Sequence, residues 1–215
     1  MNVITGLYAI TSEELMQDED LIAKSEAALV GGCKLLQYRN KHSGFDTKIT
    51  EGNRLRELCD RYGAKLIVND SIELANIIKA DGVHLGQTDE SITLARKTLG
   101  KNAIIGATCH DSLLLAKNAI QEGASYIAFG RFFPSQTKPN ASPASLSLIM
   151  EAKNILSVPI VAIGGINRDN AHQLISAGAD CIAISNDLFS RHIFSEDNTR
   201  KSIGDQTKMY QSLFC

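Results

Sequence analysis

The chain has 215 residues, a formal net charge of −2 and 44% hydrophobic residues, which is enough for one well-buried domain. A charge so near zero argues against a protein that binds nucleic acid or a membrane surface. No apolar run is long enough to span a bilayer, and the first residues lack the pattern of a signal peptide. We therefore expect a cytoplasmic protein with neither kind of partner, and the sequence leaves a homo-oligomer open.

The cysteines give no sign of a metal site. They are scattered, without a C-x-x-C pair, and four of them lie in or beside apolar segments. Buried free thiols in a reducing compartment are the simplest interpretation. The five are Cys33, Cys59, Cys109, Cys181 and Cys215.

Short apolar segments alternate with amphipathic ones along the whole chain. Eight candidate strands lie at 7–10, 35–38, 66–68, 82–85, 103–106, 126–129, 160–163 and 181–184. Apolar residues between them recur at helical spacing, as at Leu55, Leu58, Cys59 and Tyr62. We expect a last helix at 206–214 and a polar loop before it at 191–204.

Eight such repeats predict an α/β fold, a single-domain (β/α)8 TIM barrel with parallel strands over residues 1–215. The strands are nearly continuous apolar runs, as parallel strands covered on both faces should be. An open doubly wound sheet is the second interpretation, but it fits fewer strands and no G-x-G-x-x-G follows the first one. In a barrel, function is expected at the carboxyl ends of the strands.

Two cations follow the second strand. Arg39 and Lys41 are two residues apart and lie on one face if the chain stays extended. An Arg fork and a Lys point charge together suit a polyanion such as diphosphate. The alternative is a solvated basic loop.

Two carboxylates follow the third and fourth strands. Asp70 and Asp89 would end adjacent strands, about 5 Å apart in strand spacing. Each could instead be a helix N-cap, since a helix follows both. Together, beside a cationic loop, they predict a Mg²⁺ site completed by substrate phosphates.

The fifth strand is followed by Thr108, a candidate donor to phosphate, and by His110, which is more typical of a cap or a surface. His84 lies inside a strand and is interpreted as barrel filling. The sixth strand leads into a rigid, polar, cationic segment that contains Ser135 and Lys138. The long loop at 131–144 is typical of an anion-binding site and of a functional lid.

Glycines and a hydroxyl follow the last two strands. Gly164 and Gly165 come after the seventh strand and Ser185 after the eighth. In this fold, the loops at these two places commonly bind a monophosphate through backbone N–H groups. The alternative is a tight turn and a helix cap.

Taken together, these residues make the chain resemble the thiamine phosphate synthase (thiamine-phosphate pyrophosphorylase) family, from about Gly6 to Leu188. Each motif is short, but their joint order is specific. They are QYRNK at 37–41, ND at 69–70, GVHLGQTD at 82–89, IGATCH at 105–110, FPSQTK at 133–138, AIGGI at 162–166 and IS at 184–185.

The resemblance implies a transferase of a pyrimidinylmethyl group that joins hydroxymethylpyrimidine diphosphate to (carboxy)thiazole phosphate, with Mg²⁺ as cofactor. Arg39, Lys41, Lys138 and Thr108 would act in catalysis. The pyrimidine diphosphate would be held by Gln37, Tyr38, Arg39, Asn40, Lys41, Asn69, Thr108 and Lys138. Mg²⁺ would be held by Asp70 and Asp89, and the thiazole phosphate by Ser135, Gln136, Thr137, Gly165, Ile184 and Ser185.

The chain departs from the family pattern at two positions: Thr108 stands where Ser is usual, and Ser135 where Thr is usual. Both keep a hydroxyl, so we expect binding to survive. A thiazole tautomerase of the same barrel family is the second hypothesis. A barrel that binds a phosphorylated ligand without catalysis is the third.

Overall fold

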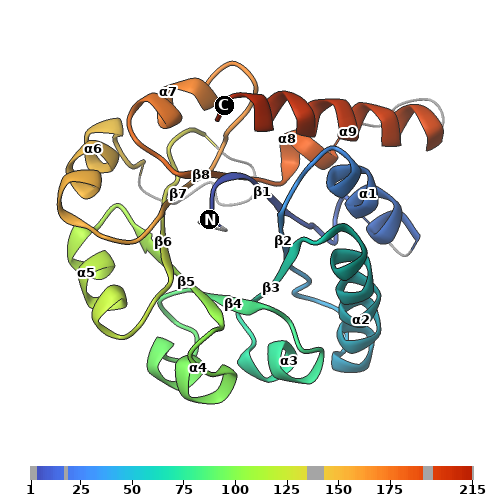
Figure 1. Ribbon diagram of the computed structural model, residues 1–215, viewed down its shortest axis with the longest axis horizontal. Coiled ribbons are helices and arrows are strands. Elements are labelled where there is room, and N and C mark those ends of the chain that lie inside the picture. Colours follow the sequence, from blue (N-terminus) through green and yellow to red (C-terminus); the bar gives the residue numbers. More distant parts are fainter. Residues whose placement is uncertain (1–3, 17–18, 135–142, 191–195, 215) are drawn as a thin grey trace.

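Eight parallel strands form a closed barrel, which confirms the predicted fold class (Figure 1). The computed structural model describes residues 4–16, 19–134, 143–190 and 196–214. Each strand pairs with the next one along the chain, and β8 closes the ring against β1. The strands are β1 (Gly6–Ile10), β2 (Leu35–Tyr38), β3 (Lys65–Asn69), β4 (Gly82–Leu85), β5 (Ile104–His110), β6 (Tyr126–Phe129), β7 (Ile160–Ile163) and β8 (Cys181–Ile184).

Helices cover the outside of the barrel (Figure 1). They are α1 (Glu19–Val30), α2 (Phe45–Tyr62), α3 (Ile72–Ile77), α4 (Ile92–Leu99), α5 (Leu113–Gln121), α6 (Leu146–Ile155), α7 (Ala171–Ser176), α8 (Asn186–Phe189) and α9 (Glu196–Ser212). Because all strands are parallel, their carboxyl ends meet at one end of the barrel. Within the described ranges, no helix has the length and apolar character needed to cross a membrane.

The side chains of each strand alternate between two buried cores. In β2, Leu36 and Tyr38 lie in the larger core between strands and helices, whereas Leu35 lies in the smaller core inside the barrel. Gln37 also points inside, where its Nε2 donates to the Tyr8 hydroxyl over 2.8 Å. The barrel interior is therefore a packed core that contains polar groups.

Strand β5 is longer than predicted. It begins at Ile104 and continues to His110, four residues beyond the predicted end. Its pairing with β6 shifts register between Thr108 and His110, which is a β-bulge, and His110 has a positive φ of 49°. The strand thus carries Thr108 past the apolar middle of the barrel.

The last helix begins earlier than predicted. The expected loop at 191–204 is wrong from residue 196 onward, because α9 starts at Glu196; residues 191–195 lie outside the described part. Ile203 is buried, whereas Arg200 and Lys201 are exposed, and α9 packs against α1. The narrow apolar face of a mostly polar segment explains why its pattern did not indicate a helix.

Candidate active site

The loop after β2 is fastened to the loop after β1. The Arg39 N–H donates to Thr11 Oγ1 over 2.9 Å. The backbone N–H groups of Lys41 and His42 both donate to Glu13 Oε2, over 2.8 and 3.0 Å. Burial alone would raise the pKa of Glu13, but hydrogen bonds from His42 and the Lys41 N–H lower it. A charged acceptor therefore holds the backbone that carries both predicted cations.

The two predicted metal ligands do come together. Lys41 Nζ lies 3.3 Å from Asp70 Oδ2, and Asp89 Oδ2 accepts a hydrogen bond from the Gly86 N–H over 2.6 Å. Burial raises the pKa of Asp89, the Gly86 N–H opposes this, and contact with the Asp70 carboxyl raises the pKa further. Two carboxyl groups of like charge therefore face each other at the end of β3 and β4, with Lys41 beside them.

The capping interpretation of these carboxylates is wrong. The N-cap of α3 is Ser71, whose Oγ accepts from Leu74 N–H over 3.1 Å. The N-cap of α4 is Ser91, whose Oγ accepts from Leu94 N–H over 3.2 Å. Asp70 instead has a left-handed φ of 66°, a conformation that is uncommon outside glycine and clusters at functional sites.

The Asp70–Asp89 pair offers the kind of ligand that a hard divalent cation prefers, but it offers only two side chains. Carboxylate oxygens are the ligands that Mg²⁺ takes from proteins, and the cation would relieve the repulsion that raises the pKa of Asp89. In the described ranges no third His, Cys, Asp or Glu joins a metal-binding group. The donor set therefore suits Mg²⁺ that takes its remaining ligands from phosphate and water.

Thr108 faces the barrel interior at the bulge of β5. Its Oγ1 lies 2.9 Å from His84 Nε2, and its carbonyl accepts from Gln87 Nε2 over 2.5 Å. Both partners come from β4 or the loop after it. His110 is exposed, as its interpretation as a surface residue predicts.

Some predicted contacts have side chains that point away from the barrel axis. Tyr38 and Ile184 belong to the core between strands and helices. The Tyr38 hydroxyl donates to Glu51 Oε2 over 2.5 Å, and Asn40 Nδ2 donates to the same oxygen over 3.0 Å. Ligand contacts of Tyr38 and Ile184 would therefore come from the backbone. Asn69, at the end of β3, is half-buried and pairs in register with His84.

The loop after β7 lies against the start of the loop after β6. The Phe133 N–H donates to the Gly164 carbonyl over 3.0 Å. Gly165 has a φ of 64°, and a Cβ there would lie 2.3 Å from the Pro134 carbonyl oxygen. Close approach of two loops thus explains the glycine without a ligand. Ser185 is the N-cap residue of α8, but its side chain makes no capping hydrogen bond.

Four predicted residues, Ser135, Gln136, Thr137 and Lys138, lie outside the described ranges, so their roles stay predictions. Sequence reasoning missed Glu13 and Gln87, which hold the backbone of the site. Glu13 could have been found, because the loop after the first strand also opens at the carboxyl end of the barrel.

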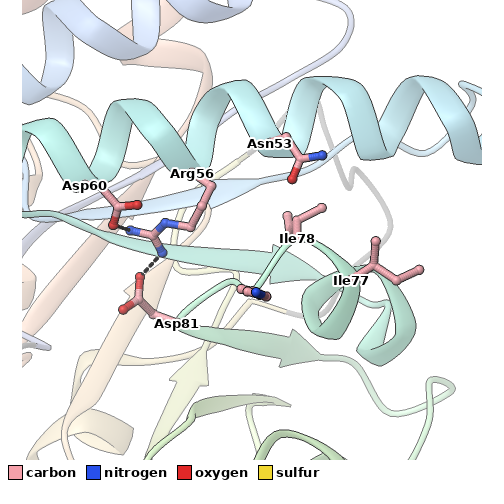
Figure 2. Close-up of a pocket in the computed structure, with 7 residues that line it drawn as sticks. Asn53, Arg56, Asp60, Ile77, Ile78 and Asp81 are labelled. Atoms are coloured by element: carbon pink, nitrogen blue, oxygen red, sulfur yellow. Dashed lines mark hydrogen bonds and ion pairs between the residues drawn. The ribbon is translucent and has the colours of Figure 1, made fainter.

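A different arrangement of charges lies at the other end of the barrel, where the strands begin (Figure 2). Asp81, just before β4, binds Arg56 from α2 and Lys65 from β3. Its Oδ2 also accepts from the Leu66 N–H over 2.9 Å. The pocket beside these groups is lined by Asn53, Arg56, Asp60, Ile77, Ile78, Lys79 and Asp81. Within it, Arg56 pairs with both Asp60 and Asp81, as expected for a structural contact between helix and barrel.

The fold and the carboxyl-end cluster define a (β/α)8-barrel protein in which Lys41, Asp70 and Asp89 come together at the carboxyl ends of the strands. Residues 7–188 match the family model described as thiamine monophosphate synthase. A thiamine-phosphate synthase from Alcanivorax borkumensis is 52% identical over 186 residues, covering 86% of each chain. One from Marinobacter nauticus is 46% identical over 209 residues, 97% of this chain and 94% of that one.

Among solved structures, a thiamine phosphate pyrophosphorylase from Pyrococcus furiosus matches with a TM-score of 0.84 and 31% identity. The match covers 100% of this chain and 98% of that one. The chain therefore belongs to the thiamine monophosphate synthase family, as the order of its motifs predicts.

Proposed function

We propose that the carboxyl end of the barrel is where this chain joins hydroxymethylpyrimidine diphosphate to a thiazole phosphate. The chain is a thiamine-phosphate-forming transferase that acts on small-molecule substrates, as its family and its relatives at about 50% identity indicate. The observation that supports the place of reaction is the cluster of Lys41, Asp70 and Asp89 at the ends of β2, β3 and β4.

In this proposal the reaction is a substitution in which the leaving group departs first. The bond between the pyrimidine methylene and the diphosphate oxygen breaks, and diphosphate leaves with the electron pair. The thiazole nitrogen then attacks the methylene. Arg39, Lys41 and Lys138 stabilise the charge that develops on the diphosphate, which is what such a step requires of a protein. No protein nucleophile is needed.

The remaining pyrimidine diphosphate contacts divide by how they reach the substrate. Gln37, Asn69 and Thr108 use side chains that face the barrel interior or its rim. Tyr38 uses its backbone, and Asn40 holds the loop through its bond to Glu51. The expected result is a diphosphate bound between the loops after β2 and β5.

We infer that Asp70 and Asp89 hold Mg²⁺ together with the diphosphate. When bound, the cation supplies positive charge that neutralises the leaving group. The two aspartates would also position the metal ion. Asp70 Oδ2 lies 3.3 Å from Lys41 Nζ, so the metal ion and the Lys41 ammonium group would both contact the same phosphate.

The thiazole phosphate is assigned to Ser135, Gln136, Thr137, Gly165, Ile184 and Ser185, across the loops after β6, β7 and β8. This placement leaves the two substrates on opposite sides of the barrel mouth. The loop at 131–144 would then contact both. Ile184 would contribute through its backbone, since its side chain is turned to the helices.

The deciding experiment mixes the purified protein with both substrates and Mg²⁺ and follows products by chromatography. Thiamine phosphate and diphosphate are expected in equal amounts. Their absence would sink the synthase function, and release of an isomerised thiazole alone would favour a tautomerase. Ligand binding without any product would leave only the non-catalytic barrel.

Two variants test the division between substrates. Lys138→Ala should slow the chemical step far more than it weakens thiazole phosphate binding, and equal losses would contradict its leaving-group role. Ser185→Ala should mainly raise the KM for the thiazole phosphate. An effect confined to the pyrimidine substrate would reverse the two-site assignment.

We further infer that the reaction takes place in the cytoplasm, because the four described cysteines are buried free thiols, which suit a reducing compartment. A homo-oligomer is a separate hypothesis. Sedimentation equilibrium of the purified chain tests it, and a mass of 23.3 kDa would reject it.

A further inference from the structure

A hydrogen-bonded row of side chains crosses the barrel interior and ends at two predicted substrate contacts. Gln37 Nε2 donates to the Tyr8 hydroxyl over 2.8 Å, and the hydroxyls of Tyr8 and Tyr126 are 2.9 Å apart. Tyr126 OH lies 2.9 Å from His84 Nδ1, and His84 Nε2 lies 2.9 Å from Thr108 Oγ1. The row draws on β2, β1, β6, β4 and β5, so it connects strands that lie across the barrel.

The row is shielded from water. Tyr126 is 0% exposed, Tyr8 1%, Gln37 3% and His84 9%. In such surroundings every donor must face an acceptor, because an unpaired buried polar group is costly. Burial also raises the pKa of both tyrosines, so each keeps its proton at neutral pH and has one hydrogen to donate.

The protons of the row can be placed from the Gln37 end. Because the Gln37 amide donates to Tyr8, the single Tyr8 proton is directed at its other neighbour, Tyr126. Tyr126 then accepts from Tyr8 and donates its own proton to His84 Nδ1. A neutral imidazole with Nδ1 as acceptor carries its proton on Nε2, which faces Thr108.

We propose that Tyr8, Tyr126 and His84 are positioning residues that fix His84 as the neutral Nε2–H tautomer and thereby orient the Thr108 hydroxyl. Thr108 Oγ1 accepts from His84, so its own proton is directed away from the row toward the barrel mouth. There it donates to an oxygen of the substrate diphosphate. This step rests on the diphosphate-binding role proposed for Thr108.

The reverse direction would have the opposite chemical result. If His84 carried its proton on Nδ1, Nε2 would accept the Thr108 proton. Thr108 would then present only lone pairs to the substrate, and these repel a phosphate oxygen. The tautomer of one buried histidine therefore decides whether Thr108 is a donor or a hindrance.

Gly106 provides the space in which the row forms. A Cβ at this position would lie 2.1 Å from Tyr126 Cζ and 2.5 Å from His84 Nδ1. The Tyr126 and His84 rings, with centroids 5.6 Å apart, meet directly over this glycine. Gly106 is therefore required on β5, because the side chains of Tyr126 on β6 and His84 on β4 meet at this position.

The direct test is the ¹⁵N chemical shifts of the His84 ring in histidine-labelled protein at neutral pH, with the signal assigned by its loss in His84→Gln. We expect a protonated Nε2 and an unprotonated Nδ1. A protonated Nδ1, or protons on both nitrogens, overturns the inference. In Tyr126→Phe the single tautomer should be lost, and an unchanged His84 spectrum would also overturn it.

Kinetics supply a second readout that a purely structural role would not move. Tyr126→Phe should lower kcat/KM for the pyrimidine diphosphate about tenfold and change the KM for the thiazole phosphate less than about twofold. Tyr62→Phe is the matched control, since its hydroxyl binds Glu26 on the outer surface. It should leave both constants unchanged.

A double-mutant cycle asks whether Tyr126 acts through Thr108. In a Thr108→Val background, Tyr126→Phe should cause no further loss, whereas additive losses would refute the coupling. Should Tyr126→Phe fail to fold, Tyr8→Phe replaces it in the same cycle with a smaller expected loss, because the Tyr126–His84 bond remains. The NMR result is independent of turnover: an inactive wild type with the expected tautomer would refute the proposed function alone.

Discussion

The aspartates at the two ends of β4 have opposite surroundings. Asp81 precedes the strand and Asp89 follows it. Burial alone would raise the pKa of Asp81, but hydrogen bonds from Lys65, Arg56 and the Leu66 N–H lower it. Burial also raises the pKa of Asp89, and its neighbour Asp70 raises it further. One carboxylate is matched with partners, and the other faces a like charge.

This difference separates a structural carboxylate from a proposed metal ligand at the two ends of a single strand. Asp81 fastens α2 to the amino end of the barrel (Figure 2). Asp89 is left with unfavourable electrostatics that a bound cation would remove. Perturbed carboxyl groups at the carboxyl end of barrel strands are where function is expected.

The largest effect is expected when charge is removed from the Asp70–Asp89 pair. Asp70→Asn and Asp89→Asn should each lower kcat/KM by about 100-fold, or roughly 2.7 kcal/mol, through loss of Mg²⁺. Turnover measured against Mg²⁺ concentration checks this, with circular dichroism to confirm folding. Wild-type activity in either variant would refute the metal assignment.

Charge removal at the other end should affect stability instead. Asp81→Asn removes a charged partner that Arg56 and Lys65 share, so we expect a loss of roughly 2 kcal/mol in urea unfolding with unchanged kcat in folded protein. Asp180→Asn is a matched control. It stands before β8, binds the Ile160 N–H over 2.9 Å and pairs with Lys153, which is half-exposed, so its loss should be smaller.

The pH dependence of the stability of Asp81→Asn tests whether the lost charge causes the destabilisation. A lowered folded-state pKa means that the contribution of Asp81 is present above its unfolded value, about 3.9, and is lost as pH falls through the folded value. The gap between wild type and Asp81→Asn should therefore close below about pH 4. A gap that stays constant would show that charge is not its cause.

A smaller effect tests which residues cap the helices. Ser71→Ala and Ser91→Ala should each cost about 1 kcal/mol of stability, because each removes the acceptor for a helix N–H. If neither serine variant lost stability, the assignment of the caps would be wrong.

The smallest expected effect concerns repulsion in the metal-free protein. A raised folded-state pKa makes Asp89 favour folding only while it is protonated, and this is lost as pH rises through the folded value. Asp70→Asn should thus raise the Tm at pH 7 by up to about 2 °C, since the exposed Lys41–Asp70 pair contributes little. Near pH 3 the gain should vanish, and a lower Tm at pH 7 would contradict it.

The effect of Mg²⁺ and inorganic diphosphate on thermal stability tests the same carboxylate pair in the ligand-bound protein. Together they should raise the Tm of the wild type more than that of Asp70→Asn. Equal shifts would mean that the cation does not bind this pair.

The strand positions and the convergence of the two aspartates could largely be predicted from the sequence. The apolar runs at 35–38, 82–85, 126–129, 160–163 and 181–184 coincide with β2, β4, β6, β7 and β8, because a strand buried on both faces leaves a continuous signal. The convergence of Asp70 and Asp89 followed from parallel strands in chain order. Local pattern was sufficient where the barrel itself fixed the geometry.

Side-chain direction and long-range contacts were harder. Tyr38 follows Gln37 directly, yet only the pleat of β2 decides that one binds Glu51 outside and the other Tyr8 inside. Glu13 acts on the backbone of Lys41, 28 residues away. His84 looked like filling because its partners, Tyr126 and Thr108, come from other strands. Such contacts depend on tertiary structure, which a single sequence does not encode locally.

The closure of the barrel also sets an order of events during synthesis. β1 pairs with β8, and the Leu7 N–H donates to Gln211 Oε1, 204 residues later in the chain. Gln211 Nε2 also donates to the Gly32 carbonyl over 2.9 Å. Contacts of such separation form slowly, so one edge of β1 stays open on the nascent chain until the last strand and α9 have left the ribosome. The strands that carry the candidate site are made early, but the ring that holds them is completed only once β8 and α9 are available.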